Sequence, residues 1–514
     1  MRHEVPMAAD TVLDLLARGA DSAPAIGAPE HKPLTFARLR ELAARTMADL
    51  NAMGIGRDDR VAIVLPNGPE MAAAFVVVAS CATTAPLNPA YRADEFEFYL
   101  TDLKAKALLV QQGEDTPARA VARKLGVPLV EVVPDRGKGA GFFMLKPEKP
   151  MAGKPAKSGK AGPDDIALVL HTSGTTSRPK IVPLAQRNVC ASARHITQTL
   201  SLTPSDACLN IMPLFHIHGL IAAVLSSLAA GGSVVCTPGF NALRFFAWLD
   251  EVKPSWYTAV PTMHQTILAR AERNTEIIAR AKLRLIRSSS ASLPPQVMTE
   301  LEKVFGAPVI ESYGMTEAAH QMASNPLPPR ARKPGSVGIA AGPEVAIMDQ
   351  EGNILPKGAL GEIVIKGPNV TAGYEANPAA NASAFSNGWF RTGDQGTMDE
   401  EGYLRITGRL KELINRGGEK VSPLEVDETI MDHPAVAQVV TFAMPHDKLG
   451  EEVAAAIVLR EGQSATEREI RDFAAKKLAD FKVPRKVVFL AEIPKGATGK
   501  LQRIGLAEKL GLGA

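Results

Sequence analysis

Short apolar runs rich in β-branched residues alternate with longer segments of helical periodicity along most of this 514-residue chain. The runs lie at 61–65, 107–110, 166–170, 233–236, 256–260, 283–287 and 308–311. Segments such as 36–53 and 294–305 carry their apolar residues at helical spacing instead. This alternation predicts an α/β fold whose parallel sheets are covered by helices and bind ligands at the carboxyl ends of their strands.

Two changes in composition divide the chain. Residues 135–165 are rich in Gly, Pro and Lys, which predicts an exposed, mobile loop or linker. After the breaker run 326–329, short strands with close turns predict a small β-rich subdomain over about 333–407. The last segment, 412–514, mixes strands with helices and is long enough to form a separate α+β domain. Within it we expect strands at 438–443, 454–459 and 486–490 and helices at 423–431 and 466–478.

The charge balance excludes nucleic acid or an anionic membrane as the main partner, because such partners require a concentrated basic surface. The chain has 58 Lys and Arg against 55 Asp and Glu, a net charge of +3. The most apolar stretch, 71–81, is too short to span a bilayer, and the N-terminus lacks the apolar region of a signal peptide. Widely spaced cysteines with no zinc pattern predict free buried thiols: Cys81, Cys190, Cys208 and Cys236. We therefore expect a cytoplasmic, soluble enzyme or binding protein, as a monomer or homodimer.

The turn after the expected strand 166–170 has the composition of a phosphate-binding loop. It reads HTSGTTSRPK from His171 to Lys180. Its glycine permits close approach of backbone N–H groups, its hydroxyls can donate to phosphate oxygens, and its lysine can neutralise charge. It is not a Walker A loop, because GxxxxGK[ST] is absent.

This loop resembles the phosphate-binding signature of the adenylate-forming superfamily, which includes acyl-CoA synthetases, luciferases and the adenylation domains of peptide synthetases. Four further motifs of the superfamily follow in its order: SYGMTE at 312–317, RTGD at 391–394, GRLKELI at 408–414 and PKGATGK at 494–500. The resemblance covers nearly the whole chain. It implies a large AMP-binding N-terminal domain, 1–410, and a small mobile C-terminal domain, 411–514, with a catalytic lysine. It also implies two steps, in which ATP converts a carboxylate into an acyl-adenylate and coenzyme A then displaces AMP.

The same resemblance assigns an ATP site. Its expected residues are Thr172, Ser173, Gly174, Thr175, Thr176, Lys180, Ser290, Ala291, Ser292, Ser312, Tyr313, Gly314, Thr316, Asp394, Arg409 and Lys500. Glu317 would hold Mg²⁺, a cation that prefers oxygen ligands, and Thr316 would contact the α-phosphate. Asp394 would accept both ribose hydroxyls, and Tyr313 would stack on adenine.

The resemblance also assigns the moving parts. Lys500 would bridge the substrate carboxylate and the adenylate in the first step, where its charge stabilises an anionic transition state. Lys411 would be the hinge about which the C-terminal domain rotates. That rotation would bring Arg416, Gly417 and Gly418 to coenzyme A.

The expected acyl pocket is polar where a fatty-acid site would be apolar. It is formed by 213–219, 287–292 and 318–322, and its candidate substrate contacts are His216, Ser289, Ser290 and His320. Such donors suit a short acid with a second carboxylate, which must be paired when it is desolvated. His218 is interpreted as a structural residue.

Longer segments favour one group within the superfamily. WYTAVPTMHQ, RSSSASL, MTEAAHQMASNPLP and ELINRGGEKVSPLEVD, with the phosphate loop, resemble the oxalate–CoA ligases. In that group Ser290 and His320 would hold the distal carboxylate of a small dicarboxylate. Ser177 and Ile181 stand where the superfamily commonly has glycine. The alternatives are malonate or another short acid, loading of a carrier protein, and a nucleotide sensor without turnover.

Overall fold

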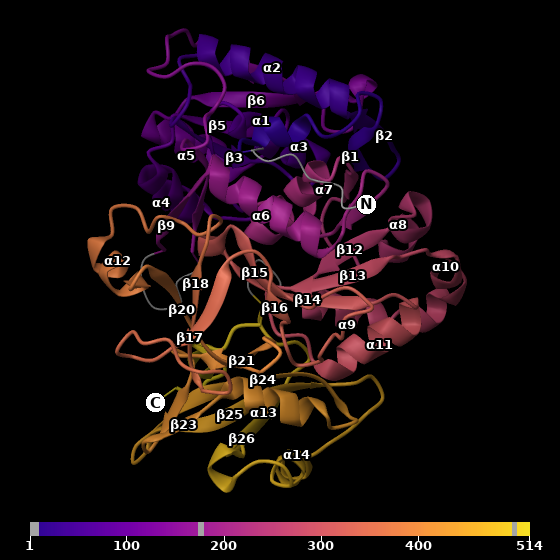
Figure 1. Cartoon of the computed structure of the whole chain (residues 1–514), viewed down its shortest axis with the longest axis vertical. Coiled ribbons are helices and arrows are strands. Elements are labelled where there is room, and N and C mark those ends of the chain that lie inside the picture. The colour runs from indigo at the N-terminus through magenta and orange to yellow at the C-terminus, as the bar shows by residue number, and fades with distance from the viewer. Residues whose placement is uncertain (1–9, 173–178, 496–500, 514) are drawn as a thin grey trace.

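The computed structural model describes residues 10–172, 179–495 and 501–513. Within them four β-sheets organise the chain, and the sheet that contains the C-terminal strands forms the lower lobe in Figure 1. Two large, mainly parallel sheets and one small antiparallel sheet form the body above it. The predicted fold class is therefore confirmed, with parallel α/β sheets in a large N-terminal part and α+β structure at the C-terminus.

The seven-stranded sheet is parallel except at its two edges. In spatial order its strands are β7 (Phe143–Pro147), β6 (Leu129–Pro134), β5 (Ala107–Gln111), β3 (Arg60–Val64), β4 (Thr83–Pro86), β8 (Ile166–His171) and β9 (Ile181–Ala185). Strand β8 leads directly into the expected phosphate loop.

The nine-stranded sheet has six parallel strands in its middle. Its order is β16 (Ile339–Ala340), β15 (His320–Ser324), β14 (Val309–Met315), β13 (Leu285–Ser289), β12 (Trp256–Ala259), β10 (Ala207–Asn210), β11 (Ser233–Cys236), β1 (Pro24–Ala28) and β2 (His31–Thr35). The carboxyl ends of β12, β13 and β14 lie side by side in this sheet.

Helices form three layers around the two large sheets. Helices of the middle layer pack into one apolar cluster with both sheets: α1 (Val12–Leu16), α2 (Phe36–Ala52), α3 (Pro69–Ala79), α6 (Gln186–Thr199), the π-helix η2 (His218–Leu225) and α7 (Ser226–Ala229). The outer layers are α4 (Ala93–Leu103) and α5 (Pro117–Leu125) on one side, and α8 (Phe245–Val252), α9 (Pro261–Leu268), α10 (Thr275–Arg280) and α11 (Pro295–Phe305) on the other.

Strand β3 illustrates why both faces of the two large sheets are covered by helices. Val61 and Ile63 face the middle layer, whereas Ala62 and Val64 face the outer layer. Successive side chains of a strand point to opposite faces, so a strand buried on both faces must be apolar throughout. This is why the continuous apolar runs in the sequence predicted strands of a helix-covered parallel sheet.

Two smaller sheets complete the chain. The antiparallel one contains β17 (Glu344–Met348), β18 (Gly361–Lys366), β19 (Phe385–Ser386), β20 (Trp389–Met398) and β21 (Leu404–Arg409), with α12 (Pro378–Ala384) beside it. The C-terminal one contains β22 (Ile414–Arg416), β23 (Glu419–Val421), β24 (Val436–His446), β25 (Gly450–Leu459) and β26 (Lys486–Phe489). It packs with α13 (Pro423–Met431), α14 (Glu467–Ala474) and α15 (Leu506–Lys509).

The prediction of one exposed loop over 135–165 is wrong in part. Phe142 and Phe143 are buried in the middle-layer cluster, and Phe143 begins β7, the edge strand of the seven-stranded sheet. Burying two aromatic side chains outweighs the local preference of Gly, Pro and Lys for loops. From Glu148 to Lys160 the side chains are mostly exposed, as expected.

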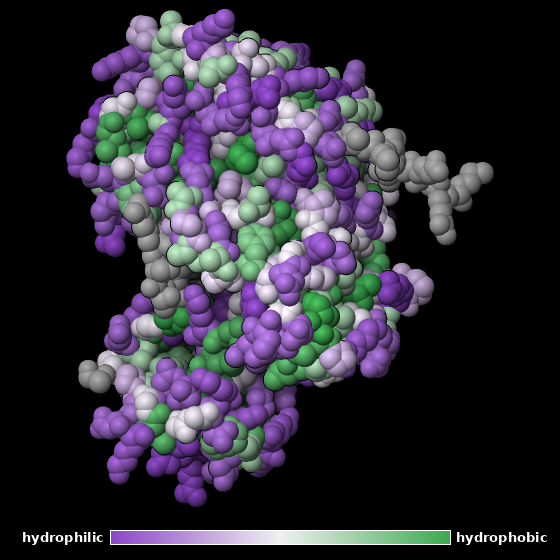
Figure 2. Space-filling model, turned by 60° about the vertical axis from the view of Figure 1, so that its left-hand side comes forward, coloured by the Kyte–Doolittle hydropathy of each residue, from purple (hydrophilic) through white to green (hydrophobic). Residues whose placement is uncertain are grey.

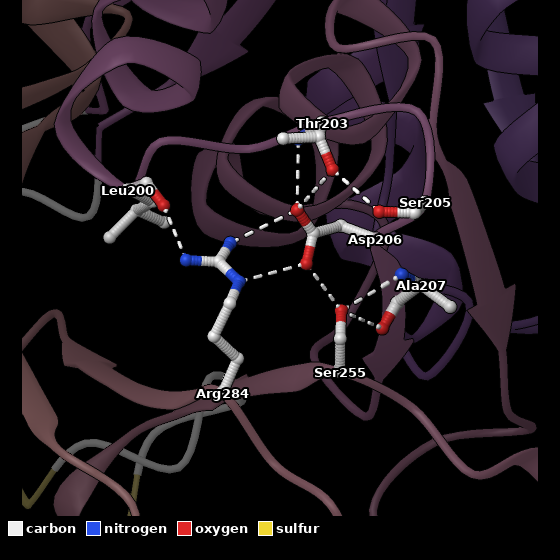
Figure 3. Close-up of polar contacts among 7 residues, drawn as sticks. All are labelled: Leu200, Thr203, Ser205, Asp206, Ala207, Ser255 and Arg284. Atoms are coloured by element: carbon white, nitrogen blue, oxygen red, sulfur yellow. Dashed lines mark hydrogen bonds and ion pairs between the residues drawn. The ribbon is translucent and has the colours of Figure 1, made fainter.

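A polar cluster clamps the amino ends of three parallel strands (Figure 3). Asp206, just before β10, receives Arg284 Nε on Oδ1 at 3.0 Å and Arg284 Nη2 on Oδ2 at 3.1 Å. Ser255, just before β12, donates to Asp206 Oδ1 at 2.7 Å. The cluster lies at the end of the sheet opposite the carboxyl ends of the strands, where ligands are expected to bind. No described helix is long and apolar enough to cross a membrane.

Candidate active site

A cavity of about 310 Å³ opens at the carboxyl ends of β12, β13 and β14. Its other walls come from the small antiparallel sheet, through Asp394 and Arg409, and from the C-terminal part, through Leu501 and Arg503. Figure 2 shows the outline of the molecule indented between the large body and the smaller C-terminal lobe. The cavity therefore lies where a parallel sheet is expected to bind its ligand.

Asp394 is the centre of the expected ribose site. It is 6% exposed, accepts a hydrogen bond from Arg409 Nε at 2.9 Å on Oδ1, and accepts another from Tyr313 Oη on Oδ2. The charge of Asp394 raises the pKa of Arg409, and burial together with Asp394 raises the pKa of Tyr313. Arg409 therefore stays a cation and Tyr313 stays neutral near neutral pH, and both line the cavity together with Asp394.

The described ends of the phosphate loop are paired with each other. Thr172 N–H donates to the Lys180 carbonyl at 2.9 Å, and Lys180 N–H donates to Thr172 Oγ1 at 3.3 Å. Lys180 Nζ lies 3.8 Å from the ring centroid of Tyr374. Ser173, Gly174, Thr175 and Thr176 of this loop lie outside the described residues, as does Lys500.

Glu317 lies in the short helix η4 (Thr316–Ala318), directly after β14. It is 6% exposed, and its Oε1 accepts a hydrogen bond from Tyr374 Oη at 2.7 Å. The described residues contain no group of three or more His, Cys, Asp or Glu that could enclose a metal. A lone carboxylate fits Mg²⁺ that takes its remaining ligands from substrate phosphates and water. Sequence reasoning missed Tyr374, which no motif marks.

The remaining residues that are expected to bind the nucleotide come from the same strand ends. Ser290, Ala291, Ser292, Ser312 and Gly314 line the cavity with Tyr313, and Thr316 is half-buried at the start of η4. A Cβ atom at Gly314 would lie 1.8 Å from the carbonyl oxygen of His320, so only glycine fits there. Sequence reasoning also missed Gln265, a cavity-lining residue of α9.

The backbone is strained where the acyl pocket was expected. Ser290 has φ 77°, Ala319 has φ 47° and His320 has φ 102°, values that side-chain-bearing residues adopt rarely. Such strain tends to gather at functional sites, where the surrounding fold enforces it. Two of these three residues are the predicted contacts of the distal carboxylate.

The polar candidates of the acyl pocket differ in their surroundings. His320 is 1% exposed, and its ring centroid lies 5.0 Å from that of His218. His216 is half-buried, and its Nδ1 accepts from the His218 backbone at 3.3 Å. Ser289 is fully buried and donates to the Ser312 carbonyl at 2.8 Å. Because its hydrogen is used within the fold, the structure favours Ser290 over Ser289 as a substrate contact.

The expected coenzyme A segment lies apart from the cavity lining. Gly417 and Gly418, with φ 59° and 101°, form the exposed turn between β22 and β23. Arg416 Nε donates to Glu452 at 2.6 Å. Lys411 lies in the exposed turn between the small sheet and the C-terminal sheet. Burial lowers the pKa of Lys180, against the charge of Glu317, and the charge of Lys411 acts in the same direction as burial.

The structure also accounts for Ile181. Its side chain is 8% exposed and belongs to the apolar cluster under α4 and α5, and its carbonyl accepts from Glu375 N–H at 3.1 Å. A glycine at this position would remove a buried apolar side chain from that cluster and leave a cavity.

Comparisons with known proteins agree with this geometry. The family model "AMP-binding enzyme" matches residues 16–375, and "AMP-binding enzyme C-terminal domain" matches residues 425–500. Oxalate–CoA ligase of Arabidopsis thaliana is 46% identical, over 97% of this chain and 98% of that protein. Oxalate–CoA ligase of Saccharomyces cerevisiae is 44% identical, over 88% of this chain and 87% of that protein.

A solved structure extends the likeness to three dimensions. The crystal structure of ATP-bound MatB from Rhodopseudomonas palustris has a TM-score of 0.87 and 30% sequence identity, and the match covers 97% of this chain and 98% of that one. The fold, the order of the motifs and both family models lead to one conclusion: this chain belongs to the AMP-binding enzyme family.

Proposed function

We propose that this chain is an AMP-forming acid–CoA ligase that converts oxalate, ATP and coenzyme A into oxalyl-CoA, AMP and pyrophosphate. The observation that carries the choice of acid is the polar end of the nucleotide cavity. There the strained residue Ser290 lines the cavity, and the buried, strained His320 lies behind it, with its ring 5.0 Å from that of His218, where a fatty acyl chain would need an apolar wall. The names of the two oxalate–CoA ligase relatives support the same acid.

In the first step a carboxylate oxygen of oxalate attacks the α-phosphorus of ATP. The bond between that phosphorus and the bridging oxygen breaks, and pyrophosphate leaves. Asp394 accepts the ribose hydroxyls, Tyr313 and Ser290–Ser292 border the adenine, and Thr316 contacts the α-phosphate. Lys180 and the hydroxyls of the phosphate loop hold the β- and γ-phosphates, and Lys500 supplies charge to the pentavalent transition state.

Magnesium belongs to this step. Glu317, fixed by Tyr374, would hold it, and the ion neutralises phosphate charge when it is bound.

In the second step the thiolate of coenzyme A attacks the acyl carbon, and the bond between that carbon and the AMP oxygen breaks. The domain boundary lies between 410 and 411, and Lys411 is the hinge that turns the C-terminal domain. The present arrangement, in which Leu501 and Arg503 line the cavity while Gly417 and Gly418 do not, suits the first step. Rotation about Lys411 exchanges the two segments, so that Arg416 and both glycines meet the pantetheine arm.

The compartment and assembly are part of the same proposal. All four cysteines are buried and free, which supports a reducing compartment such as the cytoplasm. The enzyme acts there on a small dicarboxylate, without nucleic acid or membrane, as a monomer or homodimer.

The deciding experiment measures ATP-dependent pyrophosphate release, with and without coenzyme A, for oxalate, malonate, acetate, glycolate, benzoate and octanoate. We expect turnover with oxalate alone. Preference for malonate would keep the dicarboxylate site and change the acid. Preference for acetate, benzoate or octanoate would contradict the anion-binding role of Ser290 and His320.

Two variants test the assigned roles. His320→Ala should raise the KM for oxalate far more than the KM for ATP, whereas equal effects would indicate a role in folding. Lys500→Ala should abolish adenylation and leave thioester formation from added acyl-adenylate largely intact. Turnover that requires a carrier protein in place of coenzyme A, or tight ATP binding without pyrophosphate from any acid, would replace the proposed function.

A further inference from the structure

Arg287 is a fully buried arginine in the middle of β13. Leu285, two residues earlier and so on the same face of the strand, belongs to the apolar middle layer between the two large sheets. Arg287 Nη1 lies 3.4 Å from His218 Nε2, and Nη2 lies 3.4 Å from Gln321 Oε1. Neither of these partners in the described part of the chain is a carboxylate, and the Arg287 Nε has no hydrogen-bond partner there.

The contrast with Arg284, three residues earlier, shows how unusual this environment is. Arg284 is partly exposed and makes two hydrogen bonds to the Asp206 carboxylate (Figure 3). Burial lowers the pKa of Arg287 to about 9, which leaves it charged near neutral pH. A buried cation without an anion destabilises a fold, so packing gives no reason for arginine at this position.

The neutral partners of Arg287 are themselves fixed. Gln321 Nε2 donates to Thr199 Oγ1 and to the Ala341 carbonyl, both at 3.0 Å. These two bonds fix the orientation of the amide, so that Gln321 Oε1 faces Arg287 and accepts from its Nη2. The guanidinium is thereby held against His218.

An arginine can only donate, so the arginine-facing nitrogen of His218, Nε2, must accept. The Thr258 hydroxyl, 2.6 Å from the same nitrogen, then donates to it as well. With Nε2 accepting, the ring hydrogen lies on Nδ1, which is 3.0 Å from Ser290 Oγ. With its oxygen accepting from His218, Ser290 can give its own hydrogen to a group in the cavity that it lines.

We propose that Arg287 is a positioning residue that holds His218 in the Nδ1–H tautomer, so that Ser290 donates its hydroxyl hydrogen to the distal carboxylate of the acid. The inference rests on the proposed function in taking that acid to be a dicarboxylate. The Ser290 donor held in this way would make the enzyme prefer acids that carry a charged hydrogen-bond acceptor at the end away from the reacting carboxylate. It also gives His218 a functional role, where sequence reasoning assigned a structural one.

The first test is steady-state pyrophosphate release by Arg287→Met, which keeps the volume and removes the donor. The KM for oxalate should rise about tenfold or more, the loss expected for a charge-assisted hydrogen bond, and the KM for ATP should change less than about twofold. The melting temperature should not fall, because an unpaired buried charge is removed. Arg284→Gln is the matched control, with a lower melting temperature and an unchanged KM for oxalate. An oxalate KM that stays constant in Arg287→Met overturns the inference.

The second test places the effect on His218. An Asn side chain at 218 presents its amide near the position of Nδ1, and a Gln near that of Nε2. His218→Asn should therefore keep the KM for oxalate within about threefold, and His218→Gln should raise it as Arg287→Met does. Arg287→Met should add nothing further in the His218→Asn background. Equal effects of Arg287→Met in both backgrounds would show that Arg287 does not act through His218.

The third test does not depend on which acid is used. Two-bond ¹⁵N–¹H correlation spectra of histidine-labelled protein report the tautomer, and the His218 signal is identified by its absence from His218→Asn. We expect Nδ1–H in the wild type and a gain of Nε2–H in Arg287→Met. If the wild type prefers an acid other than oxalate, the proposed function fails while this spectrum still decides the role of Arg287. An unchanged His218 tautomer in Arg287→Met overturns the inference that Arg287 positions His218.

Discussion

Tyr374 Oη donates a 2.7 Å hydrogen bond to Oε1 of Glu317, 57 residues earlier in the chain. The ring of the same tyrosine lies 3.8 Å under Lys180 Nζ. One side chain therefore orients both the expected magnesium ligand and the expected phosphate-binding lysine. Because burial and the charge of Glu317 raise the pKa of Tyr374, its hydroxyl remains a donor throughout the working pH range.

Tyr374→Phe should weaken magnesium activation selectively. The ring under Lys180 is kept, but Glu317 loses the hydrogen bond that fixes it, so the magnesium concentration for half-maximal activity should rise about three- to tenfold. Pyrophosphate release measured against magnesium at saturating ATP gives the value.

Tyr403→Phe is the control, because Tyr403 has the same arrangement away from the cavity. Its hydroxyl donates to the Ala331 carbonyl at 2.6 Å, and Lys333 Nζ lies 4.1 Å from its ring centroid. It should leave magnesium activation unchanged. If both variants raise the magnesium concentration for half-maximal activity equally, Tyr374 does not act through Glu317.

Asp394→Asn should weaken AMP binding. The amide keeps the shape of the side chain but loses the charge that accepts from Arg409 and that would accept the ribose hydroxyls. The Kd for AMP, measured by titration calorimetry, should rise at least about tenfold. Asp399→Asn, at an exposed turn carboxylate paired with Lys333, should change the Kd less than about twofold. Unaltered AMP affinity in Asp394→Asn would remove Asp394 from the ribose site.

Arg284→Gln should lower the free energy of unfolding by about 2 kcal/mol, since Asp206 would be left buried with one strong donor fewer. Burial alone would raise the pKa of Asp206, but hydrogen bonds from Arg284, Ser255 and the Thr203 backbone outweigh it, and the pKa is lowered. The stabilisation is therefore present above the unfolded pKa of about 3.9 and is lost as pH falls through the lower folded value. Urea unfolding at pH 7 and below pH 4 should show the difference between wild type and variant shrinking; a constant difference would contradict the assigned clamp.

Glu311→Gln should stabilise the protein in mildly alkaline solution. Glu311 is buried, accepts from Leu293 N–H at 2.8 Å, and has a pKa raised to about 8 by burial, with Glu428 adding to the effect. The folded state therefore binds a proton that the unfolded state has released, and stability falls between about pH 4.5 and pH 8. Melting curves at pH 5 and pH 8 should show this fall in the wild type and a smaller one in Glu311→Gln. The same fall in both would exclude Glu311 as its source.

Local patterns were sufficient to predict the elements. The apolar run 107–110 lies within β5, 233–236 is β11, and the expected helix 423–431 is α13. Each of these predictions uses residues within one strand or one or two helical turns of each other, a range over which periodicity reflects burial directly. The five motifs were equally local, and their order was enough for the resemblance to the family.

Other features depend on residues far apart in the chain. Tyr313 and Asp394 are 81 residues apart, and His218 and Ser290 are 72 apart. No periodicity relates such pairs, because the packing of a helix or a second sheet against the nine-stranded sheet sets their distance. Arg287 is a charged residue within an otherwise apolar strand, which is a weak indication of a functional role. The sequence alone does not say whether a carboxylate forms an ion pair with it.

The prediction from composition was wrong where the packing of aromatic side chains outweighed the local preference for a loop. Residues 135–165 have the Gly, Pro and Lys content of a loop, yet Phe142 and Phe143 enter the middle-layer cluster, and β7 extends the seven-stranded sheet. The sequence by itself determined the strands, the helices, the motifs and the family. The tertiary structure decided which side chains of distant segments share the buried space, because that depends on how apolar faces pack together and on which polar groups are left to pair with one another.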